Sequence, residues 1–347
     1  GTSLSDFPMK LNLQEKPSTV EDIVMEFDVP TKMRDGVRLS TDVYRPRAPG
    51  RRSVILIRTP YNNNDDSLVD FGKKFASWGY AVAIQDVRGR HDSEGDWYPS
   101  LNEGPDGYDT LRWLNQQSWS NRRVGMTGGS YNAMVQWDVA LLRPPNLKAM
   151  VSMVCPSDLF TNCWYRCGTL GWGDTLRWLA LVDGRVNQNL LAYTLPDIYR
   201  GLPQIMKDLP QIYQRFAKDF GQIFRHLPLK TADEALGRHV KFWHDWLKHQ
   251  TYDSYWRERS YHGKYSRIDV PVLHISGWYD DCADGTVQNY LGMKSSARTR
   301  LARKGQLLVM GPWHIVPTSA GDTGILTSDL RPWSILLGFR NAGSTTG

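Results

Sequence analysis

Near the N-terminus, two stretches of the chain alternate between apolar and polar residues. Residues 23–30 and 37–45 both follow a period of two, which is typical of strands with one buried face. Between them stands Met33-Arg34-Asp35-Gly36, whose Asp-Gly pair suits a tight hairpin turn. The pattern therefore predicts that antiparallel strands open the sheet.

Further along, short apolar runs alternate with amphipathic segments. Apolar runs of this length are typical of strands that are buried on both faces. Strands are expected at residues 54–58, 81–85, 124–127, 147–154, 270–276 and 306–310. Helices are expected at residues 67–78, 106–116 and 132–142. This alternation predicts the α/β class, with a mostly parallel central sheet flanked by helices.

Residues 158–262 interrupt this alternation, because they contain no clear strand and are rich in Leu and Trp. We expect an α/β core built from residues 1–157 and 263–347, with residues 158–262 inserted as a helical cap domain. An insertion of this kind would cover the carboxyl ends of the parallel strands, where such sheets bind their ligands.

Composition narrows the class of protein. Hydrophobic residues make up 41% of the 347 residues, which is enough for a sizeable core. The sequence contains no apolar run of 18 residues, so we expect no membrane-spanning helix. The net charge of +6 is spread along the chain, so we expect a solvated surface and no nucleic-acid partner. The four cysteines, which lack a zinc-binding spacing, are Cys155, Cys163, Cys167 and Cys282.

We expect these cysteines to be free thiols in a reducing compartment, which favours a cytoplasmic protein. No signal peptide is visible in the sequence. The first residues, Gly1-Thr2-Ser3, are typical of a cloning remnant, so a leader removed from the natural protein stays an open alternative.

The first candidate for chemistry is the turn Gly128-Gly129-Ser130-Tyr131, between a predicted strand and a predicted helix. A serine on such a turn projects its hydroxyl, and the following helix points its first N–H groups at the same place. This is the geometry of a nucleophile elbow. The usual pattern is Gly-x-Ser-x-Gly, however, and Asn132 stands at its second glycine. By itself the pattern is weak, and an ordinary turn is the simpler interpretation.

The order of residues along the chain strengthens the catalytic interpretation. A serine hydroxyl needs a base, usually a histidine that a carboxylate holds in place. In α/β hydrolases the three residues follow in the order Ser, Asp, His, each at the end of a strand. The last two predicted strands lead, after a glycine, into Asp280 and His314. We therefore predict an α/β-hydrolase fold with Ser130 as nucleophile, Asp280 as the orienting acid and His314 as base.

Alternatives stay open for both partners of the serine. Asp281 and Asp284 lie close to Asp280, and a small shift of the loop would bring either one to its place. His91, in a polar loop, is a weaker rival to His314 as the base. Structural roles are expected for the histidines in the helical insertion and for the one in mid-strand, namely His226, His239, His244, His249 and His274.

Five short stretches carry a family resemblance. They are Arg58-Thr59-Pro60-Tyr61, Gln85–Arg90 with Ser93-Glu94-Gly95, Gly128-Gly129-Ser130-Tyr131, Gly277-Trp278-Tyr279-Asp280 and Gly311-Pro312-Trp313. On these stretches the chain resembles the cocaine esterase and X-Pro dipeptidyl-peptidase group of α/β hydrolases, over roughly residues 20–320. That group also contains α-amino-acid ester hydrolases and glutaryl-cephalosporin acylases.

The resemblance implies roles for further residues. It implies the same Ser–Asp–His triad, with an oxyanion hole made by the hydroxyl of Tyr61 and the backbone N–H of Tyr131. Tyr61 could instead be a packed aromatic at the rim. We expect the charged loop from Arg88 to Gly95 to be structural. The resemblance also places substrate contacts at four tryptophans, for each of which core packing is the alternative: Trp164, Trp178, Trp278 and Trp313.

The chain departs from the family pattern at three points. Ala133 stands where a glycine is usual, and it is small enough for the turn to survive. His314 follows Trp313 directly, one residue earlier than in the family, which could misplace the imidazole. Only 33 residues (347 − 314) follow His314, too few for the family's C-terminal β-sandwich of jelly-roll type. We expect that domain to be missing, either naturally or by truncation.

These features predict a serine esterase that cleaves small-molecule carboxylic esters through an acyl-enzyme, without a metal ion or organic cofactor. The aromatic-rich cap favours an apolar or aromatic acyl group. One alternative is an amidase or peptidase of the same fold: a β-lactam acylase, an α-amino-acid ester hydrolase or an X-Pro dipeptidyl-peptidase. For these, Asp158, Asp174 or Asp183 would bind a free α-amino group. The other alternative is a catalytically inactive binding protein. The sequence predicts no oligomeric state.

Overall fold

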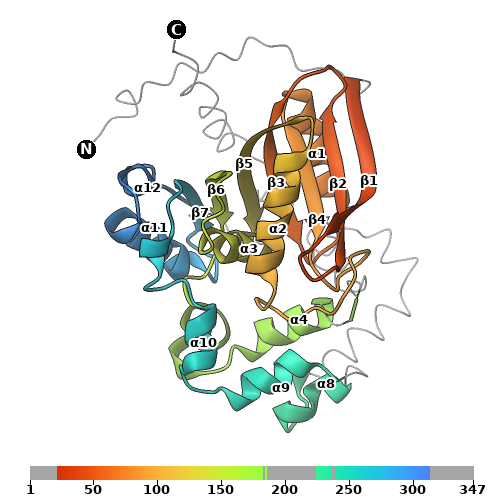
Figure 1. Cartoon of the computed structure of the whole chain (residues 1–347). Coiled ribbons are helices and arrows are strands. Elements are labelled where there is room, and N and C mark those ends of the chain that lie inside the picture. The colour runs from red at the N-terminus through yellow and green to blue at the C-terminus, as the bar shows by residue number, and fades with distance from the viewer. Residues whose placement is uncertain (1–21, 183, 186–223, 236–238, 313–347) are drawn as a thin grey trace.

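The computed structural model of the protein describes residues 22–182, 184–185, 224–235 and 239–312. Its centre is one sheet in the strand order β1-β2-β4-β3-β5-β6-β7-β8 (Figure 1). The strands are β1 (Ile23–Lys32), β2 (Arg38–Pro46), β3 (Arg52–Thr59), β4 (Ala81–Asp86), β5 (Ser120–Gly129), β6 (Leu147–Met153), β7 (Val272–Gly277) and β8 (Leu307–Gly311). The α-helices are α1 (Asp66–Ser77), α2 (Glu103–Gln116), α3 (Tyr131–Ala140), α4 (Trp172–Val182), α8 (Ala232–Ala235), α9 (Lys241–Lys248), α10 (Ser254–Arg259), α11 (Ala283–Ser296) and α12 (Arg300–Lys304).

The first two strands form the predicted hairpin. β1 and β2 pair antiparallel, and the turn between them is closed by a 2.8 Å hydrogen bond from the N–H of Met33 to the carbonyl of Val37. β2 also pairs antiparallel with β4, and from β4 to β8 every neighbouring pair of strands is parallel. The predicted α/β class with a mostly parallel sheet is therefore confirmed.

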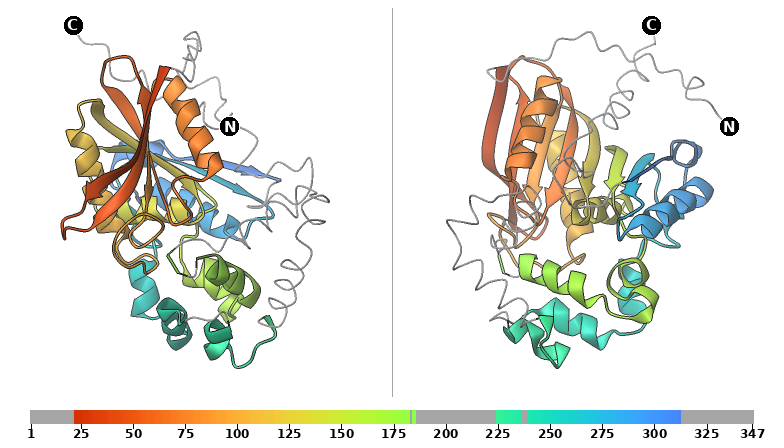
Figure 2. Two further views of the ribbon diagram at one scale, coloured as in Figure 1. Left: turned by 90° about the vertical axis from the view of Figure 1, so that its right-hand side faces the viewer. Right: turned by 180° about the vertical axis from the view of Figure 1, so that it is seen from behind.

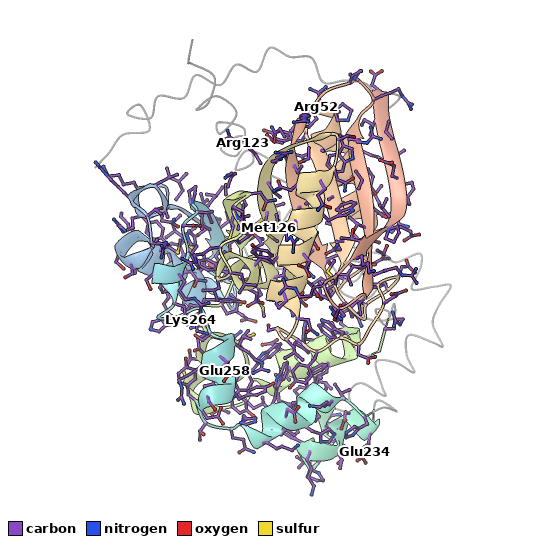
Figure 3. All side chains as sticks on the ribbon, viewed as in Figure 1. Arg52, Arg123, Met126, Glu234, Glu258 and Lys264 are labelled. Carbon is purple, nitrogen blue, oxygen red and sulfur yellow. The ribbon has the colours of Figure 1, made fainter. Side chains whose placement is uncertain are left out.

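The buried strands supply apolar side chains to both faces of the sheet. In β3, Val54 and Leu56 belong to one buried cluster, whereas Ile55 and Ile57 belong to another. This division follows from the two-residue period of a strand. α1 packs on one face, and α2, α3, α11 and α12 pack on the other (Figure 2). Met126 of β5 lies near the middle of the molecule in Figure 3 and is 1% exposed.

A layer of helices lies at one end of the sheet. α4, α8, α9 and α10 gather below the strands in Figures 1 and 2. The described part of residues 158–262 contains short helical segments and no strand, as the composition suggested. The division of the chain into a core and a cap domain stays a prediction. In the part of the chain that the structure describes, no helix is both long and apolar enough to cross a membrane.

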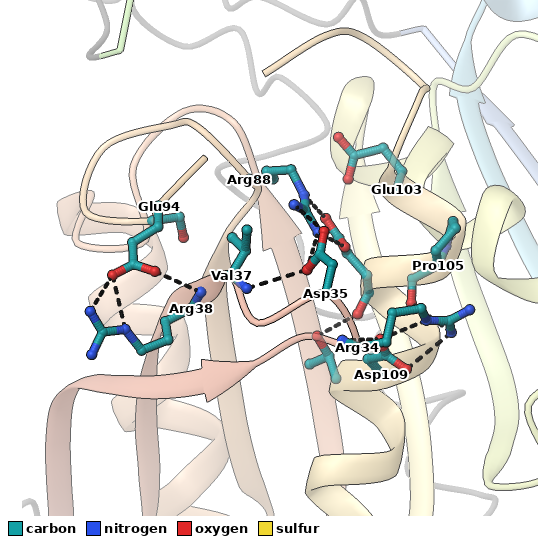
Figure 4. Close-up of polar contacts among 12 residues, drawn as sticks. Arg34, Asp35, Val37, Arg38, Arg88, Glu94, Glu103, Pro105 and Asp109 are labelled. Atoms are coloured by element: carbon teal, nitrogen blue, oxygen red, sulfur yellow. Dashed lines mark hydrogen bonds and ion pairs between the residues drawn. The ribbon is translucent and has the colours of Figure 1, made fainter. Parts of the chain in front are cut away.

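The charged loop after β4 is held by ion pairs. Arg88 binds Asp35 at 2.7 Å and Asp106 at 2.6 Å, joining the hairpin turn to the first helix turn of α2 (Figure 4). Glu94 accepts a 3.0 Å hydrogen bond from the backbone N–H of Arg38. These charges fix the loop against the sheet, which supports the structural role expected for it.

Candidate active site

Ser130 occupies a strained turn between β5 and α3. β5 ends at Gly129 and α3 begins at Tyr131, so Ser130 is the only residue between strand and helix. Its backbone has φ 56° and ψ −125°, a conformation that non-glycine residues rarely adopt. Its N–H still donates to the carbonyl of Met153 at 3.0 Å, which ties the turn to β6. Such strain is characteristic of functional sites, and here it turns the serine out of the sheet.

Close packing explains why small residues occupy the turn. Gly128 has φ +150°, and a Cβ atom at this position would lie 2.5 Å from the Cβ of Asn132. Asn132 therefore packs directly against Gly128, where any larger residue would force the first turn of α3 to shift. Ala133 is completely buried, which explains the small residue there. Gln136 donates to the carbonyls of Asn132 and Val151 at 2.9 and 3.1 Å and so holds α3 against β6.

Ser130 faces a small cavity of about 60 Å³ between the end of the sheet and the layer of helices α4, α8, α9 and α10. Three tryptophans form much of its wall, Trp164, Trp178 and Trp246. Trp246 stacks on Trp164 with 4.5 Å between ring centroids, and Trp178 lies 5.1 Å from Trp164. Trp164 and Trp178, two of the predicted substrate contacts, thus line the cavity, and their contact with substrate stays a prediction. Trp246 is an additional wall residue that the sequence analysis did not single out, because Trp residues are frequent throughout this segment.

Tyr61 lies next to this wall, and its side chain hydrogen-bonds with that of Ser130. The indole N–H of Trp178 donates to the Tyr61 hydroxyl at 3.0 Å. Burial raises the pKa of the Tyr61 phenol, and hydrogen bonding with Trp178 and Ser130 opposes that rise only in part. The phenol therefore keeps its proton at neutral pH and can donate it in a hydrogen bond to an oxygen held beside Ser130.

Tyr131 is anchored by a buried polar network. Its hydroxyl donates to a carboxylate oxygen of Glu103 at 2.8 Å and accepts from the N–H of Ser100 at 2.9 Å. Glu103 in turn forms a buried ion pair with Arg58, at 3.1 Å. Burial raises the pKa of the Tyr131 phenol and of the Glu103 carboxyl. With its side chain held in this way, Tyr131 presents its backbone N–H at the start of α3 in a fixed position.

Asp280 follows β7, as its position in the sequence suggested. It is 8% exposed, and one of its carboxylate oxygens accepts from the N–H of Cys282 at 2.7 Å. The rivals are engaged elsewhere. Asp281 is 53% exposed and pairs with Arg166 at 2.9 Å, and Asp284 accepts from the side-chain amide of Asn162 at 2.7 Å. Asp280 is therefore the most buried of the three carboxylates that follow β7.

Two predicted site residues, Trp313 and His314, lie outside the described residues. Trp278 is 67% exposed and is not part of the cavity wall, so its predicted contact with substrate has no support in this arrangement. His91, the rival base, lies in the loop after β4, where its backbone N–H donates to the carbonyl of Arg185.

His274 fits the structural role expected for it. It lies within β7, is 1% exposed, and one ring nitrogen hydrogen-bonds the side chain of Gln306 at 2.8 Å. Burial lowers the pKa of its imidazole to about 4, so this ring is neutral at physiological pH. The four cysteines are free, as expected from their spacing.

Solved structures of other proteins share this arrangement of strands and helices. An aminopeptidase from the marine sediment archaeon Thaumarchaeota archaeon matches with a TM-score of 0.65 at 21% identity, covering 90% of this chain and 52% of that chain. An α-amino acid ester hydrolase matches with a TM-score of 0.61 at 24% identity, covering 89% of this chain and 51% of that chain. At these identities the likeness concerns the fold, which is that of the α/β hydrolases.

Comparison of sequences also identifies a relative and the family. A cocaine esterase from Rhodococcus sp. (strain MB1 Bresler) is 32% identical over 295 residues, which cover 82% of this chain and 48% of that protein. The chain thus spans about half the length of this relative. A family model described as X-Pro dipeptidyl-peptidase (S15 family) matches residues 35–315. With most of its length matched, the chain belongs to the X-Pro dipeptidyl-peptidase (S15) family of α/β hydrolases.

Proposed function

We propose that the protein is a serine hydrolase that cleaves carboxylic esters through an acyl-enzyme. The observation that carries this proposal is the backbone of Ser130, which is held at φ 56° on a one-residue turn. A protein has no structural need for a serine there, since the strain costs on the order of 1–3 kcal/mol. Ser130 also lines a cavity, which offers room for the ester carbonyl beside the serine hydroxyl. This position supports a catalytic role for the strained serine.

In this mechanism the Ser130 oxygen attacks the ester carbonyl carbon while its proton passes to the imidazole of His314. Asp280 orients that imidazole and stabilises its positive charge. The tetrahedral oxyanion accepts hydrogen bonds from the Tyr61 hydroxyl and the Tyr131 N–H. Donors of this kind contribute about 3–4 kcal/mol each to the transition state. Collapse of the intermediate breaks the C–O bond, and the alcohol leaves with the proton from His314. Water then hydrolyses the acyl-enzyme by the same steps.

The cavity wall supports an ester with an apolar or aromatic acyl group. Tryptophan rings offer large apolar surfaces and favour such groups over polar ones. Among the described residues, no carboxylate lines the cavity to bind a free α-amino group. Asp158, one of the three acids considered for that role, is buried and accepts from the N–H groups of Phe160 and Thr161. Asp174 is exposed, and Asp183 lies outside the described residues.

The test is the variant Ser130→Ala with a p-nitrophenyl ester of a short acyl group. We expect kcat to fall by about 10⁴-fold or more, because the nucleophile is lost, with an unchanged circular dichroism spectrum. The matched control is Ser67→Ala, on the exposed first turn of α1, which should keep full activity. Full activity in Ser130→Ala would overturn the proposal.

Labelling with a fluorophosphonate separates the enzyme from an inactive binding protein. The wild type and Ser67→Ala should be labelled rapidly, whereas Ser130→Ala should not, because only an activated serine attacks phosphorus quickly. A wild-type protein that neither hydrolyses esters nor reacts with the probe would be the inactive binding protein.

A peptidase is the second candidate, because the family model bears that description and an aminopeptidase shares the fold. Comparing an ester with the amide of the same acyl group decides between them. We expect kcat/KM for the ester to exceed that for the amide. A higher value for an amide with a free α-amino group would favour the peptidase. We also propose a cytoplasmic location, which the four free thiols support.

A further inference from the structure

Three side chains that bind metal ions in many proteins converge between α8 and α9. Asp233 belongs to α8, His244 belongs to α9, and His239 lies two residues before α9 begins. One possible ligand atom from each lies within 4.8 Å of the other two. None of the three lines the Ser130 cavity. Glu234, the neighbour of Asp233, is labelled at the lower end of the molecule in Figure 3.

The carboxylate at the centre of this cluster is buried and incompletely satisfied. Asp233 is 0% exposed. One oxygen, Oδ2, accepts from the N–H of Val240 at 2.8 Å and contacts Nε2 of His244 at 2.8 Å. The other oxygen, Oδ1, has no hydrogen-bond partner among the described residues. Burying a carboxylate is costly unless a cation or a full set of donors compensates it. The site therefore favours a bound cation.

The distances suit a small divalent ion. Zinc binds imidazole nitrogen and carboxylate oxygen at about 2.0–2.2 Å in a tetrahedral arrangement, which puts neighbouring ligand atoms roughly 3.3 Å apart. Oδ2 of Asp233 lies 2.8 Å from His244 and 3.8 Å from Nδ1 of His239, on either side of that value. The two imidazole rings stack with 4.3 Å between their centroids, and each has a ring nitrogen within 3.8 Å of the Asp233 carboxylate.

The site also has an entrance. The side chain of His239 is 72% exposed, whereas that of His244 is 23% exposed. An ion can therefore approach from solvent on the His239 side and meet the buried carboxylate behind it. Two imidazoles and one carboxylate leave the fourth tetrahedral position for water, a ligand set that zinc accepts in other proteins.

We propose that Asp233, His239 and His244 bind Zn²⁺ and that the ion fastens α8 to α9. The ion takes no part in ester cleavage, for which Ser130 and its partners suffice. Its effect is to stabilise the helical layer that lies over the cavity. This proposal is independent of the proposed hydrolase activity, because binding can be measured without a substrate.

The chain contains a matched control. His249 and Asp253 also form a pair, with 2.6 Å between Nδ1 and Oδ2, in the same helical layer. Both side chains are partly exposed, and within the described residues no third ligand joins them. A variant that removes His249 therefore takes away a histidine–aspartate contact without touching the proposed site.

The experiment uses tag-free full chain that has been stripped with EDTA and then titrated with Zn²⁺ by isothermal calorimetry. We expect one saturable site in the wild type. His239→Ala should weaken its Kd at least about 100-fold, since it removes a ligand, and His249→Ala should leave the Kd unchanged. Because His239 is exposed, His239→Ala should retain the wild-type circular dichroism spectrum. The visible absorption of tetrahedral Co²⁺ should appear in the wild type and be lost in His239→Ala.

Thermal unfolding gives an independent readout. Zn²⁺ at 100 times its Kd should raise the unfolding midpoint of the wild type and of His249→Ala by about 3–6 °C. The midpoint of His239→Ala should not respond. The proposal is overturned if the wild type shows no saturable binding, or if His239→Ala binds Zn²⁺ as tightly as the wild type does.

Discussion

Gly128 is the residue on which the position of Ser130 most directly depends. Its φ of +150° is unfavourable for a residue with a side chain, and its Cα faces the first turn of α3. A Cβ at this position would lie 2.5 Å from the Cβ of Asn132 and 3.0 Å from its carbonyl oxygen. Neither atom can move away without shifting α3, whose first residue, Tyr131, carries one of the proposed oxyanion donors.

Gly128→Ala should therefore impair catalysis even though it adds one methyl group. We expect kcat/KM for a p-nitrophenyl ester to fall at least about 100-fold, because small displacements at a reacting centre are costly. The control is Gly125→Ala in the same strand, where the new Cβ meets only the carbonyl of Ala149 at 3.8 Å. Equal activity in the two variants would show that the turn does not depend on close packing at Gly128.

The local turn and the order of the predicted partners of Ser130 could be read from the sequence, but the alternatives close to Asp280 could not be separated there. Small residues between a strand and a helix predict the tight turn at Ser130, because the geometry of such a turn is set by its own few residues. The sequence favours Asp280 but leaves Asp281 and Asp284 as alternatives. Their burial and partners separate them further, since Asp281 pairs with Arg166 and Asp284 with Asn162.

At the scale of elements, Glu103 joins three parts of the core. It lies in the first turn of α2, pairs with Arg58 of β3, and accepts from Tyr131 of α3. The side chains of Arg58 and Glu103 are 0% and 4% exposed. Removing one partner of a buried ion pair typically lowers the free energy of unfolding by about 3–5 kcal/mol, because the remaining charge is left uncompensated.

Glu103→Gln keeps an oxygen for the Tyr131 hydroxyl but removes the charge opposite Arg58. We expect the free energy of unfolding in urea to fall by about 3 kcal/mol. We also expect kcat to fall about 10-fold with KM unchanged, because the backbone N–H of Tyr131 is a proposed donor to the transition state. Glu26→Gln, which breaks the more exposed pair with Arg45, should cost less than about 1 kcal/mol and leave kcat unchanged. Similar losses in both variants would refute the special role of Glu103.

The strands of the sheet were predictable, and the network around Glu103 was not. Apolar runs such as residues 54–58 and 81–85 reveal buried strands because nearly all of their side chains are apolar and must be kept from water. Arg58 and Glu103 are 45 residues apart in the chain, and their pairing depends on how β3 and α2 pack. α11, which starts just after Asp280, was not anticipated either, because its residues lack a marked apolar stripe.

For the whole molecule, buried titratable groups set how stability depends on pH. Burial raises the pKa of Asp86 to about 8 and lowers that of His274 to about 4. The folded protein keeps the Asp86 proton up to about pH 8, whereas the unfolded chain releases it near pH 4, so stability falls as pH rises through this window. His274 acts in the opposite direction. The unfolded chain binds its proton below about pH 6.5, so stability falls as pH drops from there toward 4.

Between pH 6.5 and 8, the loss of stability that Asp86 causes is therefore no longer opposed by a gain from His274. Over these 1.5 pH units the free energy of unfolding should fall by about 2 kcal/mol, at 1.36 kcal/mol per unit. Asp86→Asn should flatten this slope, because the amide resembles the protonated acid and keeps an oxygen for the N–H of Asn63. Urea unfolding at several pH values measures both slopes, and Asp66→Asn, on the exposed start of α1, should retain the wild-type slope. Parallel slopes for the wild type and Asp86→Asn would mean that Asp86 is already ionised in the folded protein.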